Sequence, residues 1–241
     1  MERSVDAGPP EQNLLLRSLP ADEYARLLPA LEPVELSVRQ VIWQPNSRIH
    51  SLYFPRTCVL SLLTPLSDAE PVEVATLGRE GMAGTPVVLG VWITNVMGIA
   101  QVPGTAARMD AERFMSQVRS SDGALFPLLL RYAQALHEQT AQSVACNRHH
   151  AIEERCARWL LMTQDRVGAD QFPLTQEFLS FMLGVRRASV TVAAGMLQRA
   201  GLIRYQRGQI TVVDRAGLEA ASCECYVAVT RKYEQLLHVS V

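Results

Sequence analysis

Arginine and small polar residues gather in the last third of the sequence, where they could bind a polyanion. Between residues 171 and 213 there is one acid, Glu177, and five arginines, a local excess of four positive charges. The arginines are Arg186, Arg187, Arg199, Arg204 and Arg207. The whole chain of 241 residues has a formal net charge of −1, but the field at the contacting face decides such binding. A merely solvated basic surface is the alternative interpretation.

Histidines and carboxylates around residue 150 have a spacing that suits metal ligands. His149, His150, Glu153 and Glu154 include i, i+4 pairs that could hold a metal ion on one face of a helix. They fall at a predicted junction between two helices, where such residues are more often hinge or surface residues. We therefore expect no metal and no cofactor.

The five cysteines indicate neither a disulfide framework nor an iron–sulfur cluster. Cys58, Cys146, Cys156, Cys223 and Cys225 are scattered along the chain, whereas a cluster needs several cysteines close together. Cys223 and Cys225 could form a redox pair, but about 200° separates two such positions on a helix, so we expect them to face apart. The sequence also has no nucleophile elbow, phosphate loop or paired-carboxylate pattern, so an enzyme is not expected.

The arginine-rich segment has the pattern of two short helices joined by a turn. Thr175 suits the N-cap of a helix over 176–183, and Gly184 suits the position just after its end. Small Ser180, four residues before Gly184, permits the close approach of a second helix over 187–199. The inward positions of that second helix are Val190, Ala193, Ala194 and Leu197. The pattern predicts a helix-turn-helix.

Two β-rich runs about a glycine turn follow over residues 201–213, and they are typical of a wing. Polar residues lie at the start of the second helix, whose rear face is apolar; they are Arg186, Arg187, Ser189 and Thr191. A recognition helix contacts base edges and phosphates with this part of its surface. The segment therefore predicts binding of double-stranded DNA, and a helical hairpin with a purely structural role is the alternative.

The preceding segments alternate between helical and β character. Residues 14–31 have helical spacing in two short pieces, and residues 34–109 contain β-rich runs separated by turn residues. The runs are 34–38, 41–43, 51–54, 59–64, 72–77, 91–94 and 98–102. About eight short strands at this spacing predict a sandwich or barrel-like β unit. Helical patterns cover 110–118, 125–146, 151–166 and 216–237, with a linker at 168–172.

The helix predicted over 125–146 has a row of residues with 4-3-4-3 spacing, as in helices that pair with a partner helix. The row consists of Leu125, Leu129, Tyr132, Leu136, Gln139, Ser143 and Cys146. We predict a homodimer through the first five of these residues. The second half of the row is less hydrophobic, so the alternative is that the helix packs on the chain's own β unit.

Together the elements resemble the Crp/Fnr superfamily of bacterial transcription regulators over about residues 14–213. The resemblance is strongest at Leu174-Thr-Gln-Glu-Phe-Leu-Ser-Phe-Met-Leu-Gly-Val-Arg-Arg-Ala-Ser-Val190 and next strongest at Val72-Glu-Val-Ala-Thr-Leu-Gly-Arg-Glu-Gly-Met-Ala-Gly84. It implies an α+β chain: an N-terminal cyclic-nucleotide-binding-like β-roll (14–118), a long dimerisation helix (119–150), and a C-terminal winged helix-turn-helix with a last helix (151–241). It also implies a homodimer on a two-fold operator, with RNA polymerase as a further partner.

The expected β-roll departs from relatives that bind cyclic AMP. Such relatives carry a glycine–glutamate pair for the ribose and, further on, an arginine for the cyclic phosphate. Here no basic residue occurs between Arg79 and Arg108, so a buried cyclic phosphate would lack a charged partner. Cyclic AMP is therefore not expected as the effector. The polar candidates for another effector are Arg79, Glu80, Gly81, Thr94 and Asn95.

The expected recognition helix departs from relatives that read TGTGA-like half-sites with an Arg-Glu pair and a further Arg one turn later. This sequence keeps Arg187 but has Ala188 and Val192 at the other two positions. We expect a different operator, with Arg187 on a guanine and Ala188 or Val192 against a thymine methyl. The candidates for phosphate contacts are Thr175, Gln176, Arg186, Ser189, Arg204 and Arg207.

The sequence thus predicts a sequence-specific, DNA-binding transcription regulator whose effector is unknown. The alternative is a sensor or adaptor protein that uses a degenerate helix-turn-helix to bind another protein. DNA affinity that falls steeply with salt would exclude the adaptor. No apolar stretch is long enough for a membrane span, and residues 1–12 show no signal peptide, so we expect a cytoplasmic protein.

Overall fold

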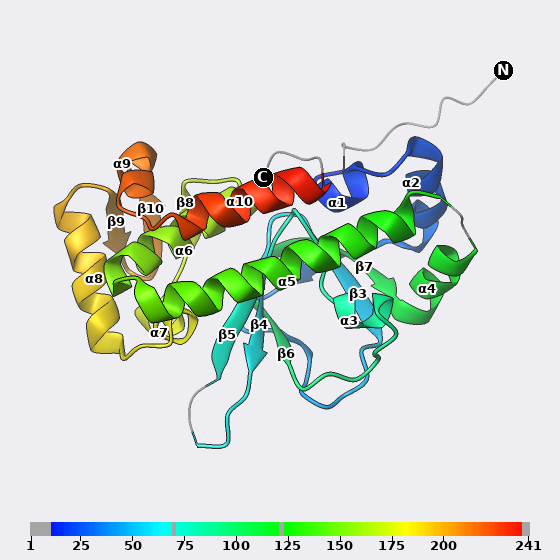
Figure 1. The fold of residues 1–241 in the computed structure, drawn as a ribbon, viewed down its shortest axis with the longest axis horizontal. Helices are drawn as coiled ribbons and strands as arrows, with labels where there is room; N and C mark the ends of the chain where they lie inside the picture. Colours follow the sequence, from blue (N-terminus) through cyan, green and yellow to red (C-terminus); the bar gives the residue numbers. More distant parts are fainter. Residues whose placement is uncertain (1–10, 69–70, 121–122, 238–241) are drawn as a thin grey trace.

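A β-roll and a smaller winged helical domain lie along one long helix in the computed structural model, which describes residues 11–68, 71–120 and 123–237 (Figure 1). The chain begins with α1 (Leu14–Arg17), α2 (Ala21–Leu27) and a 3-10 turn, η1 (Leu28–Ala30), which confirms two helical pieces over 14–31. Most of residues 1–12, short segments at 69–70 and 121–122, and the end of the last domain (238–241) lie outside the described residues.

Two antiparallel sheets form the β-roll. The strands described there are β1 (Glu32–Leu36), β2 (Val41–Trp43), β3 (Ser51–Pro55), β4 (Val59–Thr64), β5 (Val72–Leu77), β6 (Met97–Val102) and β7 (Gly104–Asp110). One sheet has the order β1-β7-β3 and the other β2-β6-β4-β5. Apolar side chains of both sheets, such as Leu52, Phe54, Leu60 and Val102, are almost wholly buried and form the core of the roll. The runs predicted at 41–43, 59–64 and 72–77 coincide with strands.

The prediction of a strand at 91–94 is wrong. Val91 and Ile93 are 50% and 56% exposed, and the segment makes only a single bridge between Ile93 and Arg48. Arg48 also lies over the Trp92 ring, 4.4 Å from its centroid. A β-rich run needs a neighbouring strand edge, and this one lies in a loop beside a short helix, α3 (Thr85–Val88), that the sequence did not predict.

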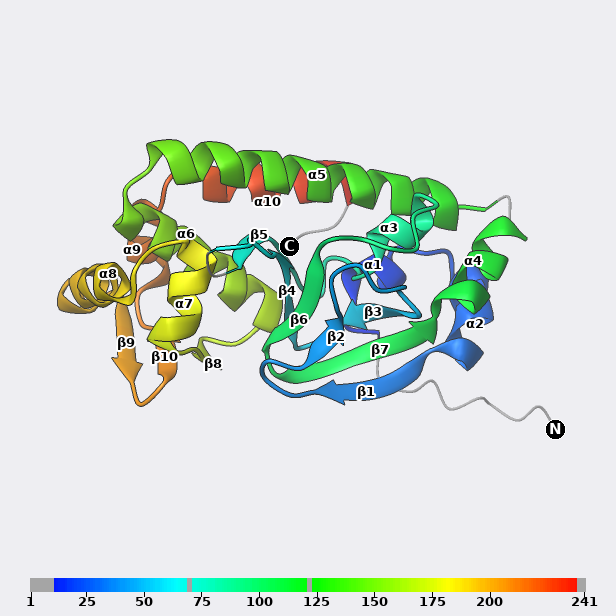
Figure 2. The ribbon, with the colours of Figure 1, turned by 90° about the horizontal axis from the view of Figure 1, so that it is seen from below.

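After α4 (Ala111–Arg119), the helix α5 (Leu125–His149) runs along the roll and ends beside the C-terminal elements (Figure 2). Its 25 residues span about 37 Å at 1.5 Å per residue. No helix in the described part of the chain is both long enough and apolar enough to cross a membrane.

The row of α5 predicted to face a partner helix is filled by the chain itself. The first five residues of the row are 0–9% exposed. Tyr132 donates to the Met82 carbonyl of the roll at 2.8 Å and lies 6.4 Å, between ring centroids, from Tyr233 of the last helix, α10 (Cys225–Leu237). The assignment of this row to a dimer interface is therefore corrected: Leu125, Leu129, Tyr132, Leu136 and Gln139 pack within the chain, which was the alternative.

The C-terminal part contains the predicted helix-turn-helix and wing. Its elements are α6 (Ile152–Val167), β8 (Gln171–Pro173), α7 (Gln176–Leu183), α8 (Arg187–Arg199), β9 (Ile203–Gln206), β10 (Gln209–Val212) and α9 (Arg215–Ala220). The helix predicted over 216–237 is instead two helices, α9 and α10. The Ser222 hydroxyl donates to the Glu219 carbonyl at 2.8 Å, which competes with continuation of the helix. The turn lets α10 run back along α5, where Arg131 donates to the Leu236 carbonyl at 2.9 Å.

A buried ion pair joins the β-roll to the small domain. Arg166 of α6 donates from Nε to Glu80 Oε1 at 2.7 Å, and the two side chains are 4% and 0% exposed. Arg166 Nη2 also donates to Gln139 Oε1 of α5 at 3.0 Å. Burial by itself lowers the pKa of Arg166, but the charge and hydrogen bond of Glu80, together with the charges of Tyr233 and Asp165, more than offset this, and the net pKa is raised. Gly78 leaves room for the pair, since a Cβ there would lie 2.3 Å from Arg166 Cγ.

Replacing Glu80 should destabilise the protein strongly, because it leaves the Arg166 charge buried without its partner. We expect Glu80→Ala to lower the free energy of unfolding by about 3–5 kcal/mol in a urea titration. The control Glu112→Ala removes an exposed partner of Arg48 (3.0 Å), and its cost should stay below about 1 kcal/mol. Equal, small effects of the two variants would contradict the role given to the buried pair.

Candidate nucleic-acid interface

The helix-turn-helix is held together by the caps and apolar residues that the sequence indicated. The Thr175 side chain accepts from the Phe178 amide at 3.1 Å, which caps α7. Gly184 ends that helix with a φ of 61°, a left-handed conformation that favours glycine. The four predicted inward residues of α8, Val190, Ala193, Ala194 and Leu197, are 0–4% exposed. The rear face of α8 is therefore fixed, and its front face is left to solvent.

The predicted DNA-contact residues lie on α7, on α8 and on the wing, all at one end of the molecule (Figure 2). Seven of them are exposed: Thr175, Arg186, Arg187, Ala188, Val192, Arg204 and Arg207. Gln176 and Ser189 are half-buried. The Thr191 hydroxyl lies 3.0 Å from Gln176 Oε1, and this hydrogen bond links the two helices.

The wing is a tight hairpin beside α8. Arg207 and Gly208 at its tip have φ values of 52° and 75°, as in a type I′ turn, and the sheet order is β8-β10-β9. Arg204 is exposed, whereas Tyr205 is half-buried on the opposite face of β9. Burial raises the pKa of Tyr205, while a hydrogen bond with the Gln176 backbone and the charge of Arg187 act to lower it. Tyr205 was not predicted from the sequence, although strand alternation places it beside buried Ile203.

The electrostatics of this surface suit an anion. Arg186, Arg187, Arg204 and Arg207 make no ion pair with another described residue. Glu177, the acid of this segment, is paired with Arg39 of the β1–β2 turn at 3.0 Å. The arrangement therefore presents a local positive surface on a chain of nearly neutral net charge, and it can bind a phosphate backbone.

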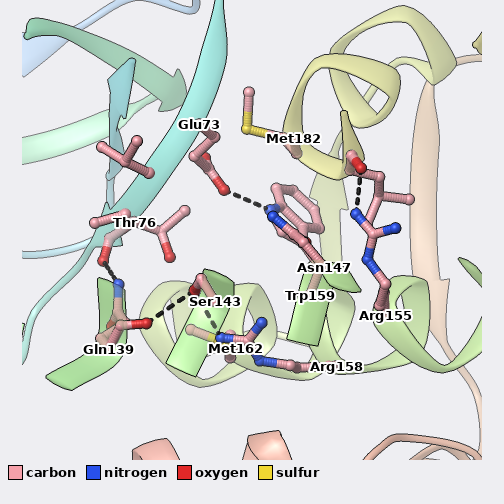
Figure 3. A pocket seen from close by; sticks show the side chains of 13 residues that line it. Glu73, Thr76, Gln139, Ser143, Asn147, Arg155, Arg158, Trp159, Met162 and Met182 are labelled. Atoms are coloured by element: carbon pink, nitrogen blue, oxygen red, sulfur yellow. Dashed lines mark hydrogen bonds between the residues drawn. The ribbon is translucent and has the colours of Figure 1, made fainter. Parts of the chain in front are cut away.

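A small polar cavity separates this domain from the roll (Figure 3). Glu73 of β5 accepts from Trp159 Nε1 at 3.2 Å and from the Ser61 hydroxyl at 2.7 Å, while Arg158 donates to Ser143 Oγ at 3.1 Å. The volume of about 30 Å³ suits water rather than an effector. The cavity lies where β5, α5, α6 and α7 meet.

Burial raises the pKa of Glu73 to about 8, against hydrogen bonds from Ser61 and Trp159 and the charges of Arg166 and Arg158. The Ser61 hydroxyl, which donates to Glu73 Oε2 at 2.7 Å, also lies within hydrogen-bonding distance of Gln101.

The five predicted effector residues do not form one pocket, which corrects that prediction. Glu80 is held in the buried ion pair, and Gly81 lies under the Tyr132 ring, 2.2 Å from the position of an added Cβ. Arg79 lies in a separate surface hollow with Glu11 and Arg56, and Asn95 is exposed. They lie apart because Glu80 and Gly81 of the β5–α3 loop are covered by α6 and α5, whereas Asn95 is exposed.

Thr94 alone of these residues lines an open, mainly apolar pocket of about 220 Å³ between the roll and α5. Trp43, Leu77, Leu136 and His137 are among the other lining residues. No arginine or lysine is among the described residues that line it.

The structure does not bring together the residues around position 150 that were considered as metal ligands. His149 is exposed, and the Glu154 carboxylate accepts from the Ala151 amide at 2.9 Å, which caps α6. His150 instead lies beside Cys146, Cys223 and Cys225, so these three of the five cysteines are close together in space.

The fold and this surface define a winged helix-turn-helix protein with a β-roll. Residues 154–221 match the family model of a Crp-like helix-turn-helix domain. Among curated proteins, no sequence matches the chain significantly.

Three solved structures illustrate the similarity of the whole chain. A CRP-family transcriptional regulator from Thermus thermophilus has 16% identity and a TM-score of 0.65, with 78% of this chain and 96% of that one covered. FixK2 from Bradyrhizobium japonicum has 13% identity, a TM-score of 0.62 and coverages of 80% and 98%. The c-di-GMP-responsive regulator CLP from Xanthomonas campestris has 16% identity and a TM-score of 0.59, with 80% of this chain and 99% of that one covered. The resemblance is confirmed: residues 154–221 form a Crp-like helix-turn-helix domain, and the chain has the fold of Crp/Fnr regulators.

The raised pKa of Glu73 predicts a pH-dependent stability. The folded state keeps a proton that the unfolded chain, with an ordinary carboxyl pKa of 4.5, has released, so stability falls as pH rises toward about 8. Glu73→Gln keeps the neutral form at every pH. As pH rises from about 5 to about 8, its free energy of unfolding should increase by at least about 1 kcal/mol relative to that of the natural protein in urea titrations. Glu112→Gln, at an exposed carboxylate, is the control; parallel pH profiles of all three proteins would refute the assignment.

Proposed function

We propose that the protein is a sequence-specific DNA-binding transcription regulator that binds a two-fold operator as a homodimer. The observation that carries the proposal is the set of exposed arginines on the first turn of α8 and on the wing, which have no acidic partner among the described residues. The buried rear face of α8 supports it further, because it turns these arginines away from the core. The expected contact with RNA polymerase stays a prediction of the same proposal.

The roles of the contact residues follow from their places on the elements. Arg187 lies at the first position of α8 and reads a guanine, while Ala188 or Val192 contacts a thymine methyl. The wing arginines hold the DNA backbone, since they flank a turn at the side of the groove. The other residues proposed for phosphate contacts are Thr175, Gln176, Arg186 and Ser189. Thr191 positions Gln176 through the hydrogen bond between their side chains.

The proposed dimer interface is the outer row of α5, because the inner row (Leu125, Leu129, Tyr132, Leu136 and Gln139) is buried within the chain. The outer row has 4-3-4-3-4 spacing and is exposed or half-buried along its length; it consists of Phe126, Leu130, Ala133, His137, Thr140 and Val144. Phe126, Leu130 and Val144 are 40%, 42% and 68% exposed, which is unusual for side chains so apolar. Pairing of two α5 helices by this row would relate two α8 helices by a two-fold axis, as half-sites one helical turn apart require.

The pocket between the roll and α5 supports an uncharged, mainly apolar effector. Its described lining offers threonine hydroxyls and His137 as polar groups, and a cyclic phosphate would find no guanidinium there. The proposal therefore includes independence from cyclic AMP. Two lining residues, Ala133 and His137, also belong to the outer row of α5, so an occupant would lie beside the dimer contact.

The two arginine roles predict different losses of DNA affinity. Arg187→Ala should cost about 1–3 kcal/mol on an operator selected from random DNA and relax the preference at one base pair. Arg204→Ala should weaken operator and scrambled duplex alike and lower the slope of log affinity against log salt by roughly 1. The measurement is a fluorescence titration of both duplexes over a salt series.

Two results would contradict this proposal at different levels. A uniform loss from Arg187→Ala, together with changed base preference in Arg204→Ala, would reverse the two roles. Absence of any salt-dependent DNA binding by the natural protein would favour the sensor or adaptor alternative.

A charge in the outer row should dissociate the dimer. We expect the natural protein to sediment at twice the chain mass of 26.7 kDa at micromolar concentration, and Leu130→Glu and Val144→Glu to sediment as monomers. The matched control is Leu66→Glu, which charges a leucine that is 51% exposed outside α5. A monomeric natural protein, or dimeric forms of both α5 variants, would exclude this interface.

A further inference from the structure

Four metal-binding side chains converge where α10 begins beside the end of α5. The ligand atoms of Cys146, His150, Cys223 and Cys225 all lie within 4.8 Å of one another. The three cysteines are 0–4% exposed and are free thiols in the structure. Cys223 lies in the turn before α10 and Cys225 is the first residue of that helix, so the two do not follow helical geometry and both reach the same point. The expectation that they face apart is wrong for this reason.

The spacing of these atoms fits a single tetrahedral ion. The sulfurs of Cys146 and Cys223 are 3.5 Å apart, and the Cys225 sulfur is 3.5 Å from His150 Nδ1. In a regular tetrahedron around Zn²⁺, two sulfur ligands lie about 3.8 Å apart and a sulfur and a nitrogen about 3.6 Å. The side chains are therefore close to ligand positions without movement of the backbone.

The groups around the four side chains are those that orient metal ligands. His150 Nε2 is 3.1 Å from Glu224 Oε1, which directs the other ring nitrogen, Nδ1, toward Cys225. A carboxylate behind a histidine in this way is the usual outer partner of a zinc ligand. Gln142 Nε2 lies 3.0 Å from the Cys225 sulfur and donates to it.

Nearby positive charge suits three thiolates. The guanidinium groups of Arg155 and Arg158, both on α6 and at most 9% exposed, interact electrostatically with the Cys146 sulfur. Three thiolates, a neutral imidazole and a divalent ion together carry one negative charge, which these arginines offset. Their Nε atoms are also buried without a hydrogen-bond partner among the described residues.

We propose that Cys146, His150, Cys223 and Cys225 form a Cys₃His site for a tetrahedral divalent cation of borderline softness, with Zn²⁺ as the first candidate. Binding releases the thiol protons to solvent. Four protein ligands leave no open position, so the site is structural. It fastens the turn between α9 and α10 to the end of α5, and it thereby holds α10 along the long helix. This inference goes beyond the proposed DNA binding and does not depend on it.

The test measures metal binding by the full chain, purified under reducing conditions, with Zn²⁺ alone and with Co²⁺ as a spectroscopic probe. We expect one Zn²⁺ per chain by elemental analysis, a rise in the thermal midpoint on adding Zn²⁺, and the visible absorption of a tetrahedral cobalt–thiolate site. Cys223→Ser and Cys146→Ser should lose all three. Cys156→Ser is the matched control, because it removes a buried cysteine outside the site and should keep them.

A milder variant keeps the test independent of folding. Glu224 is 78% exposed, so Glu224→Gln should fold normally. Loss of the charge behind His150 should lower the affinity for Zn²⁺ by about 10–100-fold. The inference is overturned if the natural protein binds no Zn²⁺ under these conditions, or if the cobalt spectrum persists in both Cys146→Ser and Cys223→Ser. A Cys146–Cys223 disulfide in peptide maps of protein that binds no Zn²⁺ would overturn it in favour of a redox pair.

Discussion

The ion pair between Arg166 and Glu80 is the interaction on which the arrangement of the chain depends. Each buried charge is costly unless it is matched, so the two side chains hold their elements in one relative position. Arg166 lies on α6, which packs directly against α8, and Glu80 lies in the loop after β5. Through Gln139 the same guanidinium also contacts α5. Helix α8 is therefore joined to the β-roll by a short series of packed elements.

The long helix α5 serves two surfaces because a helix can present two apolar rows. The inner row packs against the roll and α10, and the outer row faces solvent beside the apolar pocket. Under the proposed function, an effector in that pocket would touch the outer row through His137. Any displacement of α5 would then reach α6 through Gln139 and Arg166, which is a physical route from the pocket to the DNA-contacting helix. The proposed metal site fastens α10 to the far end of this same helix.

The face proposed to contact DNA illustrates how weakly net charge describes a protein surface. The chain as a whole is close to neutral, yet the exposed arginines of α8 and the wing have no acidic partner among the described residues. The nearby acid, Glu177, is turned toward Arg39 on the roll. Pairing across the domain boundary thus leaves the positive charge on the other side uncompensated.

Signals that lie within a few residues were enough to predict the Thr175 cap, the Gly184 turn, the buried face of α8, and the strands β2, β4 and β5. Features that join distant segments could not be predicted in this way. Glu80 and Arg166 are 86 residues apart, and Cys146 and Cys223 are 77 residues apart. From local patterns Glu80 was predicted to line an effector pocket, and the cysteines were expected to be scattered. The inner row of α5 was likewise predicted to form the dimer interface. Caps and periodicity are set by the backbone geometry of one element, whereas these roles depend on which other elements pack against it.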